Sequence, residues 1–182
     1  MKHVLPLIWL RKKIVLRVYG VLSVCTVCLF FCGCKIYSFT GASVSPDIKT
    51  VSIESFINQS DNGNVFISQD LTEQIKDKFL SETNLKLVPN GGDLEFSGVI
   101  TGWRISSQAP TANQTSAINR LSITVQVQCT NRIYPKESWN QTFTRYDDYD
   151  SSLSQADVEQ QLTRSVNAQL AEDIFNKAFV NW

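Results

Sequence analysis

The stretch NRLSITVQVQCTN, Asn119–Asn131, alternates apolar and polar side chains with a period of two. Successive side chains of a β-strand point to opposite faces, so this pattern predicts a strand with one apolar and one polar face. A polar outer face is typical of a sheet that other elements cover on one side only. The residues predicted to face the core are Leu121, Ile123, Val125, Val127 and Cys129, and those predicted to face outward are Ser122, Thr124, Gln126 and Gln128.

Shorter alternating segments predict further strands on either side of this one. They are Thr50–Phe56, the region from Leu94 to Thr101, and Trp139–Tyr146, with a short extended piece at Leu85–Val88. The glycines Gly98 and Gly102 predict a bulge or a close approach of two backbones. Polar or turn-forming residues predict connections at Asn58–Asn64, Pro89–Asp93, Gln108–Ser116 and Ile133–Glu137.

Two segments show the four-residue spacing of an amphipathic helix. In the first, Ser68 is the expected N-cap, with Asp70 in the first turn and an end near Thr83. Its expected buried stripe is Leu71, Ile75 and Phe79, with Leu80 beside them. In the second, Ser154 and Asp157 resemble a capping box, and the stripe is Val158, Leu162, Val166, Leu170 and Ile174. The aromatic end, Ile174–Trp182, predicts docking on the sheet, with a partner contact as the alternative.

The order of these segments predicts an α+β fold, with a mostly antiparallel or mixed four-stranded sheet and two helices packed on one face. The opposite face of the sheet would be polar and free to meet water or another protein.

The N-terminal region has the pattern of a bacterial lipoprotein signal. Basic residues between Lys2 and Arg17 precede the apolar run Val18–Phe31, and Gly33 and Cys34 follow. A positive region, an apolar region and a small residue define a secretory signal, and Cys34 after Gly33 resembles a lipobox, so we expect lipidation of Cys34. The alternative, a membrane-spanning anchor, needs about 20 apolar residues, and Arg17 cuts the run short. We expect residues 1–33 to be a removed signal peptide, 34–47 a lipidated tether, and 48–182 a single domain.

The composition of the mature chain excludes several function classes. Removal of the signal takes away five basic residues and no acidic one, so a chain with 17 Lys and Arg against 17 Asp and Glu becomes one of about −5. We therefore expect no nucleic-acid partner, because such proteins carry a basic footprint. The single histidine, His3, lies in the signal, so no imidazole remains for a triad or a zinc site. We expect no metal, no cofactor and no catalytic residue. Cys129 would be a buried thiol without a disulfide partner.

The remaining polar clusters have weaker interpretations. Asp147, Asp148 and Asp150 could hold a divalent cation, but a solvated loop before the second helix is the expected structure, because no further ligands flank them.

Segments spread over most of the mature chain resemble the LptE family of lipopolysaccharide-assembly lipoproteins, Bacteroidetes type. They are YSFTG (Tyr37–Gly41), KTVSIESF (Lys49–Phe56), KDKFL (Lys76–Leu80), GGDLEFSGVITGW (Gly91–Trp103), NRLSITVQVQCTN (Asn119–Asn131), FTRYDDYDS (Phe143–Ser151) and EDIFNKAFVNW (Glu172–Trp182). None is a catalytic motif. Lys35 departs from the glycine expected after the lipid cysteine.

The resemblance implies a non-enzymatic protein at the periplasmic face of the outer membrane, held by the lipid on Cys34. It would partner an LptD-like β-barrel, largely inside the barrel, and help to pass lipopolysaccharide to the outer leaflet. Its lipid-binding basic residues are not placed residue by residue. The candidates are Arg104, Arg120, Arg132, Lys136 and Arg145, each with solvated surface charge as the alternative.

Other function classes remain open at this stage. One is a subunit of another envelope complex, or a glycan-binding module whose platform would need Trp103, Trp139 and Tyr146. Another is a hydrolase that uses carboxylates alone, such as Asp147 with Asp150.

Overall fold

The computed structural model describes residues 44–61, 64–109 and 117–179. In chain order, its elements are β1 (Thr50–Ile53), β2 (Ile57–Asn58), α2 (Val65–Glu82), β3 (Lys86–Leu87), β4 (Leu94–Gln108), β5 (Ile118–Asn131), the 3₁₀ turn η1 (Pro135–Glu137), β6 (Trp139–Asp150) and α3 (Gln155–Phe179). The α+β class is confirmed. The sheet has six strands instead of the four expected, because the two-residue strands β2 and β3 also join it.

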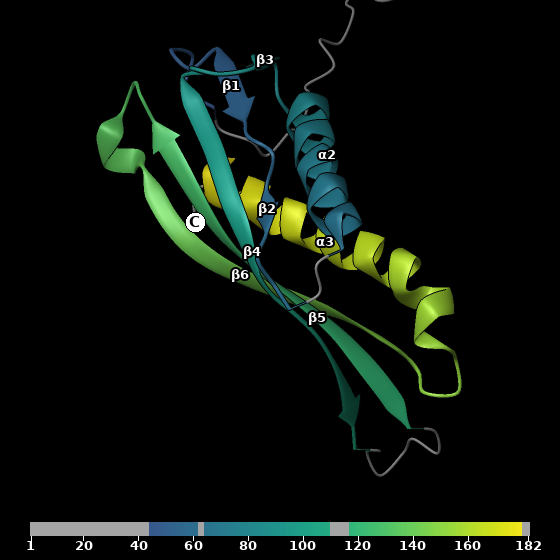
Figure 1. Ribbon diagram of the computed structural model, residues 1–182. Coiled ribbons are helices and arrows are strands. Elements are labelled where there is room, and N and C mark those ends of the chain that lie inside the picture. Colours follow the sequence, from purple (N-terminus) through teal and green to yellow (C-terminus); the bar gives the residue numbers. More distant parts are fainter. Residues whose placement is uncertain (1–43, 62–63, 110–116, 180–182) are drawn as a thin grey trace, which may run out of the picture. The chain divides into compact units, whose positions relative to one another are not determined.

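The sheet is mixed, and its long strands form one antiparallel half. The strand order is β3-β1-β4-β5-β6, with β2 pairing β4 outside this path (Figure 1). Strand β1 runs parallel to both β3 and β4, and β2 runs parallel to β4. The pairs β4–β5 and β5–β6 are antiparallel and include most of the residues of these strands.

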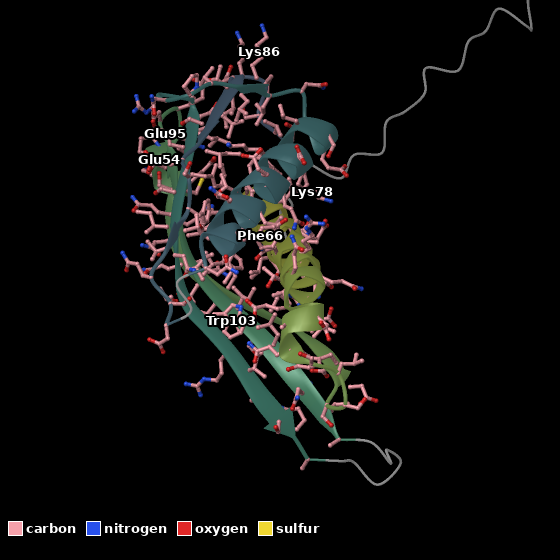
Figure 2. The ribbon with its side chains drawn as sticks, turned by 45° about the vertical axis from the view of Figure 1, so that its right-hand side comes forward. Glu54, Phe66, Lys78, Lys86, Glu95 and Trp103 are labelled. Carbon is pink, nitrogen blue, oxygen red and sulfur yellow. The ribbon has the colours of Figure 1, made fainter. Side chains whose placement is uncertain are left out.

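Both helices cover the same face of the sheet. Figure 2 shows Phe66 and Lys78 on the helix side and Glu54 and Glu95 on the opposite side. The inward residues predicted for β5 are all buried, and Gln126 and Gln128 on the other side are exposed. The register predicted from the Asn119–Asn131 stretch is therefore confirmed.

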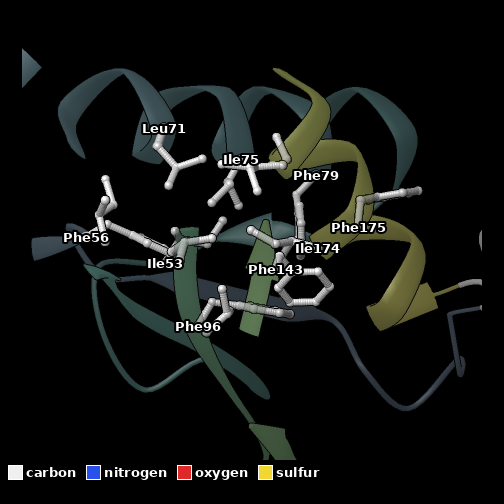
Figure 3. Close-up of a cluster of buried hydrophobic side chains, with 14 of the residues drawn as sticks. Ile53, Phe56, Leu71, Ile75, Phe79, Phe96, Phe143, Ile174 and Phe175 are labelled. Atoms are coloured by element: carbon white, nitrogen blue, oxygen red, sulfur yellow. The ribbon is translucent and has the colours of Figure 1, made fainter. Parts of the chain in front are cut away.

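The core centres on Phe79 of α2, which is 1% exposed. Its ring centroid lies 4.9 Å from that of Phe96 in β4, and 5.6 and 5.2 Å from those of Phe175 and Phe179 in α3, all with edge-on geometry. Such edge-to-face pairs contribute roughly 0.5–1.5 kcal/mol each beyond area burial. Figure 3 shows this cluster, with Leu71 and Ile75 on the same helix face as Phe79. The aromatic end of α3, as far as Phe179, is docked on the core as predicted.

The start predicted for α2 is wrong. The N-cap is Asn64, whose side-chain Oδ1 accepts the backbone N–H of Phe66 at 3.0 Å. Ser68 lies inside the helix, is buried, and donates its hydroxyl to the carbonyl of Val65. The earlier start places Ile67, which is fully buried, on the core side of the helix. The predicted end holds, since Thr83 is the C-cap, but Leu80 is 47% exposed and does not belong to the buried stripe.

The second helix begins directly after Ser154, as the capping pattern predicts. Four of its five stripe residues are buried: Leu162, Val166, Leu170 and Ile174; Val158 is half-buried. Asn167 is also fully buried, and its amide donates to the carbonyl of Ile67 and to the carboxylate of Asp70. This polar contact fixes how α3 lies against α2.

Glycines account for one close approach and one bulge, both of which the sequence pattern indicated. A Cβ at Gly98 would meet the ring of Phe56, and the β4–β5 register shifts between Ile100 and Gly102, which marks a bulge. A third glycine, Gly92, lies where the connection from β3 to β4 crosses β1. A Cβ there would stand 2.6 Å from the backbone nitrogen of Ser52.

The same crossing covers Ser52, which is buried although it lies on the polar side of the sheet. Next to Gly92, the Asp93 carboxylate accepts the backbone N–H groups of Lys49 and Thr50 at 2.8 and 2.9 Å. The polar face is therefore covered at β1 and open over β4, β5 and β6.

The signal peptide, Cys34 and most of the tether and of the Gln108–Ser116 loop lie outside the described residues. The described end of the tether forms a turn at Pro46–Asp47, and Tyr134 donates its hydroxyl to Asp47 at 2.5 Å. Among the helices described, none is long and apolar enough to cross a membrane.

Candidate binding surface: the open face of the sheet

The side of β4, β5 and β6 that faces away from the helices is the candidate site, and we call it the open face. The strand registers bring its side chains together in rows across the three strands. They are Ser97, Val99, Arg104 and Ser106 from β4, Arg120, Ser122, Thr124, Gln126 and Gln128 from β5, and Asn140, Thr142, Thr144, Tyr146 and Asp148 from β6. Hydroxyl and amide groups dominate this surface.

Cross-strand hydrogen bonds order the middle of the open face. The hydroxyls of Thr124 and Thr144 lie 3.0 Å apart, and the Gln126 amide donates to Asn140 at 3.2 Å. Pairs of this kind contribute about 0.2–1 kcal/mol each. The side chains are thus held in place before any partner arrives.

The open face is hollowed beside the β1–β2 connection. A shallow depression of about 430 Å³ is bordered by Glu54 of the β1–β2 connection and Ile57 of β2 on one side, and by Gln126, Gln128 and Asn140 on the other. The Ile57 side chain is 57% exposed at its rim. The depression therefore offers amide hydrogen-bonding groups beside one apolar contact.

A charged cluster lies at the end of the open face where β5 begins and β6 ends. Arg120 donates to both carboxylate oxygens of Asp148, at 2.7 and 2.8 Å, and its guanidinium lies 3.7 Å from the centre of the Tyr146 ring. The hydrogen bonds from Arg120 lower the pKa of Asp148 below its ordinary value of 3.8. The pKa of the Arg120 guanidinium is in turn raised above its ordinary value, chiefly by its hydrogen bond to Asp148.

The predicted loop at Asp147, Asp148 and Asp150 is therefore wrong, because all of them belong to strand β6. Asp148 is ion-paired across the sheet. Asp150 accepts the backbone N–H of Ser152, which lowers the pKa of its carboxyl. Within the part of the chain that the structure describes, no group of three or more acidic, Cys or His side chains could hold a metal ion.

The candidate basic residues do not converge on one site. Arg104 and Arg120 are diagonal neighbours on the open face, since Arg104 pairs with Ser122 and Arg120 with Ser106. The other candidates lie elsewhere: Arg132 pairs with Glu95 at 2.9 Å beyond the end of β5, Lys136 is in η1, and Arg145 faces the helix side and binds Asp173 of α3.

The aromatic candidates do not form a platform either. Trp139 is on the helix side, with its ring 6.2 and 6.0 Å from Phe96 and Phe143. Trp103, labelled in Figure 2, packs against the core, and its buried Nε1 has no hydrogen-bond partner among the described residues. Only Tyr146 of the three lies on the open face, at 49% exposure.

Sequence reasoning found the β5 part of this surface and missed the β6 part. The signal was present, because Asn140, Thr142 and Thr144 alternate with the buried Phe143.

Cys129 lies on the helix side, free of any disulfide, and burial raises the pKa of its thiol to about 12. It is the structural thiol that its position in the strand predicted.

Comparisons with known proteins identify the family. The model of the family LptE, described as lipopolysaccharide-assembly, matches residues 48–178. Among curated proteins, none matches this chain. Solved structures that resemble it include a minor lipoprotein from Acinetobacter baumannii (20% identity, 72% of this chain and 92% of the other, TM-score 0.47). Another is the rare lipoprotein B from Shewanella oneidensis (15% identity, 69% and 91%, TM-score 0.47). The family match spans the described sheet and both helices, and the chain therefore belongs to the LptE family of lipopolysaccharide-assembly proteins.

Proposed function

We propose that this protein is a non-catalytic outer-membrane lipoprotein that partners an LptD-like β-barrel in lipopolysaccharide assembly. The lipid on Cys34 holds it at the periplasmic face of the membrane. Its domain contacts the barrel through the open face and supports barrel assembly and the passage of lipopolysaccharide to the outer leaflet.

The observation that carries this proposal is the open face itself. A sheet with helices on one side and ordered hydroxyl and amide side chains on the other has a broad surface available for another macromolecule. Non-obligate protein interfaces are about as polar as the rest of a protein surface, so its polarity suits a protein contact.

The chemistry of the acidic residues supports a non-catalytic role. A carboxylate hydrolase needs a general acid whose pKa is raised. The pKa values of Asp148 and Asp150 are instead lowered by their hydrogen bonds to Arg120 and Ser152. These carboxylates serve the structure of β6 and its following turn.

Co-purification with site-specific crosslinking tests the proposal. A tagged, full-length protein extracted from its own membranes should retain a large outer-membrane barrel protein. A photo-crosslinking residue at Gln126 or Gln128 should capture that barrel, because both side chains are exposed on the open face. The matched control is Ser81, exposed at the end of α2. Capture from Ser81 and not from Gln126 or Gln128 would place the contact on the helix side and reject the open face.

Depletion of the protein tests the cellular role. Loss of the whole protein should lower both the amount of correctly assembled barrel and the surface lipopolysaccharide. Unchanged levels of both after full depletion would reject a role in lipopolysaccharide assembly.

A further inference from the structure

Strand β6 forms one edge of the sheet. It pairs with β5 and, among the described strands, with no other (Figure 1). It is 12 residues long, whereas the opposite edge strand β3 has two residues. The edge of β4 beyond β2 begins at the bulge near Gly102. Among these edges, β6 is therefore the long and regular one.

The hydrogen-bond pattern shows which backbone groups of β6 point outward. Ser151 donates its N–H to the carbonyl of Ala117, and the register runs without a shift from Asp150 to Trp139. In an antiparallel pair, alternate residues direct both backbone groups toward the partner strand. The odd-numbered residues of β6 thus bond to β5. The residues that direct N–H and C=O away from β5 are Asn140, Thr142, Thr144, Tyr146 and Asp148.

One end of this edge is already closed. The Asp147 carboxylate accepts the outward N–H of Asp148 at 2.9 Å, and the Asp150 carbonyl accepts the N–H of Leu153. The open part is therefore Asn140–Tyr146, whose outward residues are all exposed.

This open part lacks most of the devices with which proteins protect free edges, and its one charged side chain, Arg145, is paired with Asp173 of α3. Proline, lysine, bulges and short length are the usual ones. Strand β6 contains no proline or lysine, and its pairing with β5 has no bulge. A regular edge of this kind is a template for an added strand.

The charges beside the open edge indicate what would bind there. Asp148 is paired with Arg120, and Asp173 with Arg145. Among the described residues, no Lys or Arg lies within 4.0 Å of Asp147 or Asp150. The carboxyl end of β6 therefore carries uncompensated negative charge that a cationic side chain would complement.

We propose that an extended segment of the barrel partner adds to the sheet as a strand along Asn140–Tyr146, with Lys or Arg side chains directed to the acidic end of β6, where Asp147 and Asp150 lie on opposite faces of the sheet. This inference rests on the proposed function and specifies its contact. Backbone hydrogen bonds from the outward residues hold the segment, and the open face continues onto it without a break.

Proline substitution tests the added strand. Thr144→Pro removes an outward N–H and keeps the ladder to β5, and proline is tolerated at such edge positions. Thr144→Ala keeps the N–H and is the matched control. In the full-length tagged protein, we expect Thr144→Pro to retain on the order of tenfold less barrel, equivalent to about 1.4 kcal/mol. Thr144→Ala removes the same hydroxyl from the open face but keeps the N–H, so we expect it to retain clearly more barrel than Thr144→Pro, and equal retention by the two variants would overturn the added strand.

The outcomes separate the two proposals. If the wild type retains no barrel protein, the proposed function fails and the added strand fails with it. If the wild type and Thr144→Pro retain equal amounts, only the added strand fails. A photo-crosslinker at Thr142 guards against misfolding of the proline variant: an adduct with the barrel supports the proposal, and an adduct with a second copy of this chain overturns it.

The charge requirement has its own variant. Replacing Asp147 and Asp150 with Asn should lower barrel retention roughly threefold at low salt and make no difference at high salt, because exposed ion pairs are weak and screened. Retention unchanged at low salt would remove the cationic side chain from the proposal.

Discussion

The phenyl ring of Phe56 lies so close to Gly98 that a Cβ atom on the glycine would stand 2.3 Å from Cε1 of the ring. Phe56 is 4% exposed and follows β1, and its backbone N–H is bound by the Thr72 hydroxyl of α2 at 3.0 Å. One aromatic side chain thus joins the β1–β2 connection to β4. The absence of a side chain at Gly98 makes this packing possible.

Gly98→Ala should destabilise the domain by about 1–3 kcal/mol, because the added methyl overpacks the site. Movement of the Phe56 ring alone would not relieve the clash, because the backbone carbonyl of Gln126 would also lie 2.9 Å from the same Cβ. Gly102→Ala is the control in the same strand, where the new methyl would meet Thr124 at an ordinary 3.4 Å. Urea denaturation of both variants measures the difference. Equal stabilities would contradict the close packing.

Val125→Asp should prevent folding, because it places an unpaired carboxylate at a position with no solvent exposure. Gln126→Asp, one residue along, should cost no more than about 1 kcal/mol, because it loses only the exposed hydrogen bond to Asn140 on the open face. Thermal unfolding followed by circular dichroism compares the two variants. Similar melting temperatures would show that the β5 register is wrong.

Asp93→Asn should destabilise the domain at neutral pH and lose its effect in acid. Hydrogen bonds from the backbone N–H of Lys49, and then from Thr50, lower the pKa of Asp93 below its ordinary 3.8. The stabilisation is therefore complete above pH 3.8 and is lost as the pH falls through the lower pKa of the folded state. Melting temperatures of wild type and variant from pH 7 down to pH 2 should converge. A constant difference down to pH 2 would contradict the role assigned to this carboxylate.

Cys34→Ser should block lipidation and leave an unprocessed or soluble species. One acyl chain binds membranes only marginally, and stable anchoring requires more than one. Mass spectrometry of the mature N-terminus gives the direct measurement. An unmodified Cys34, or a mature chain that begins at another residue, would reject the lipidation site.

The sequence predicted the parts of the fold in which one pattern dominates. In β5, five apolar residues alternate with polar ones, and each lies on the predicted side. The stripe of α3 is equally regular. These predictions succeed because side-chain period follows directly from backbone geometry.

The errors occur where tertiary contacts decide between local alternatives. Asn64 and Ser68 are both good N-caps, and the helix starts at the one that buries Ile67. The acidic end of β6 resembles a loop in sequence, but it pairs with β5 without interruption as far as Asp150, and Tyr149 between the acidic residues is buried in the core. Strands β2 and β3 have two residues each, too few for any period to appear.

The candidate site could be predicted only in part. The outward residues of β5 were readable from its alternation. The sequence could not show which strand becomes an edge, because that depends on the order β3-β1-β4-β5-β6.

Because Cys129 is buried, the reactivity of its thiol reports when the domain opens. With its thiol pKa at about 12 and the side chain 3% exposed, Cys129 should not react with maleimide while the domain is folded. Single cysteines introduced on the surface can then be labelled without background from Cys129. The rate at which Cys129 itself reacts measures how often β5 separates from the helices. This gives the opening rate of the domain in the absence of denaturant.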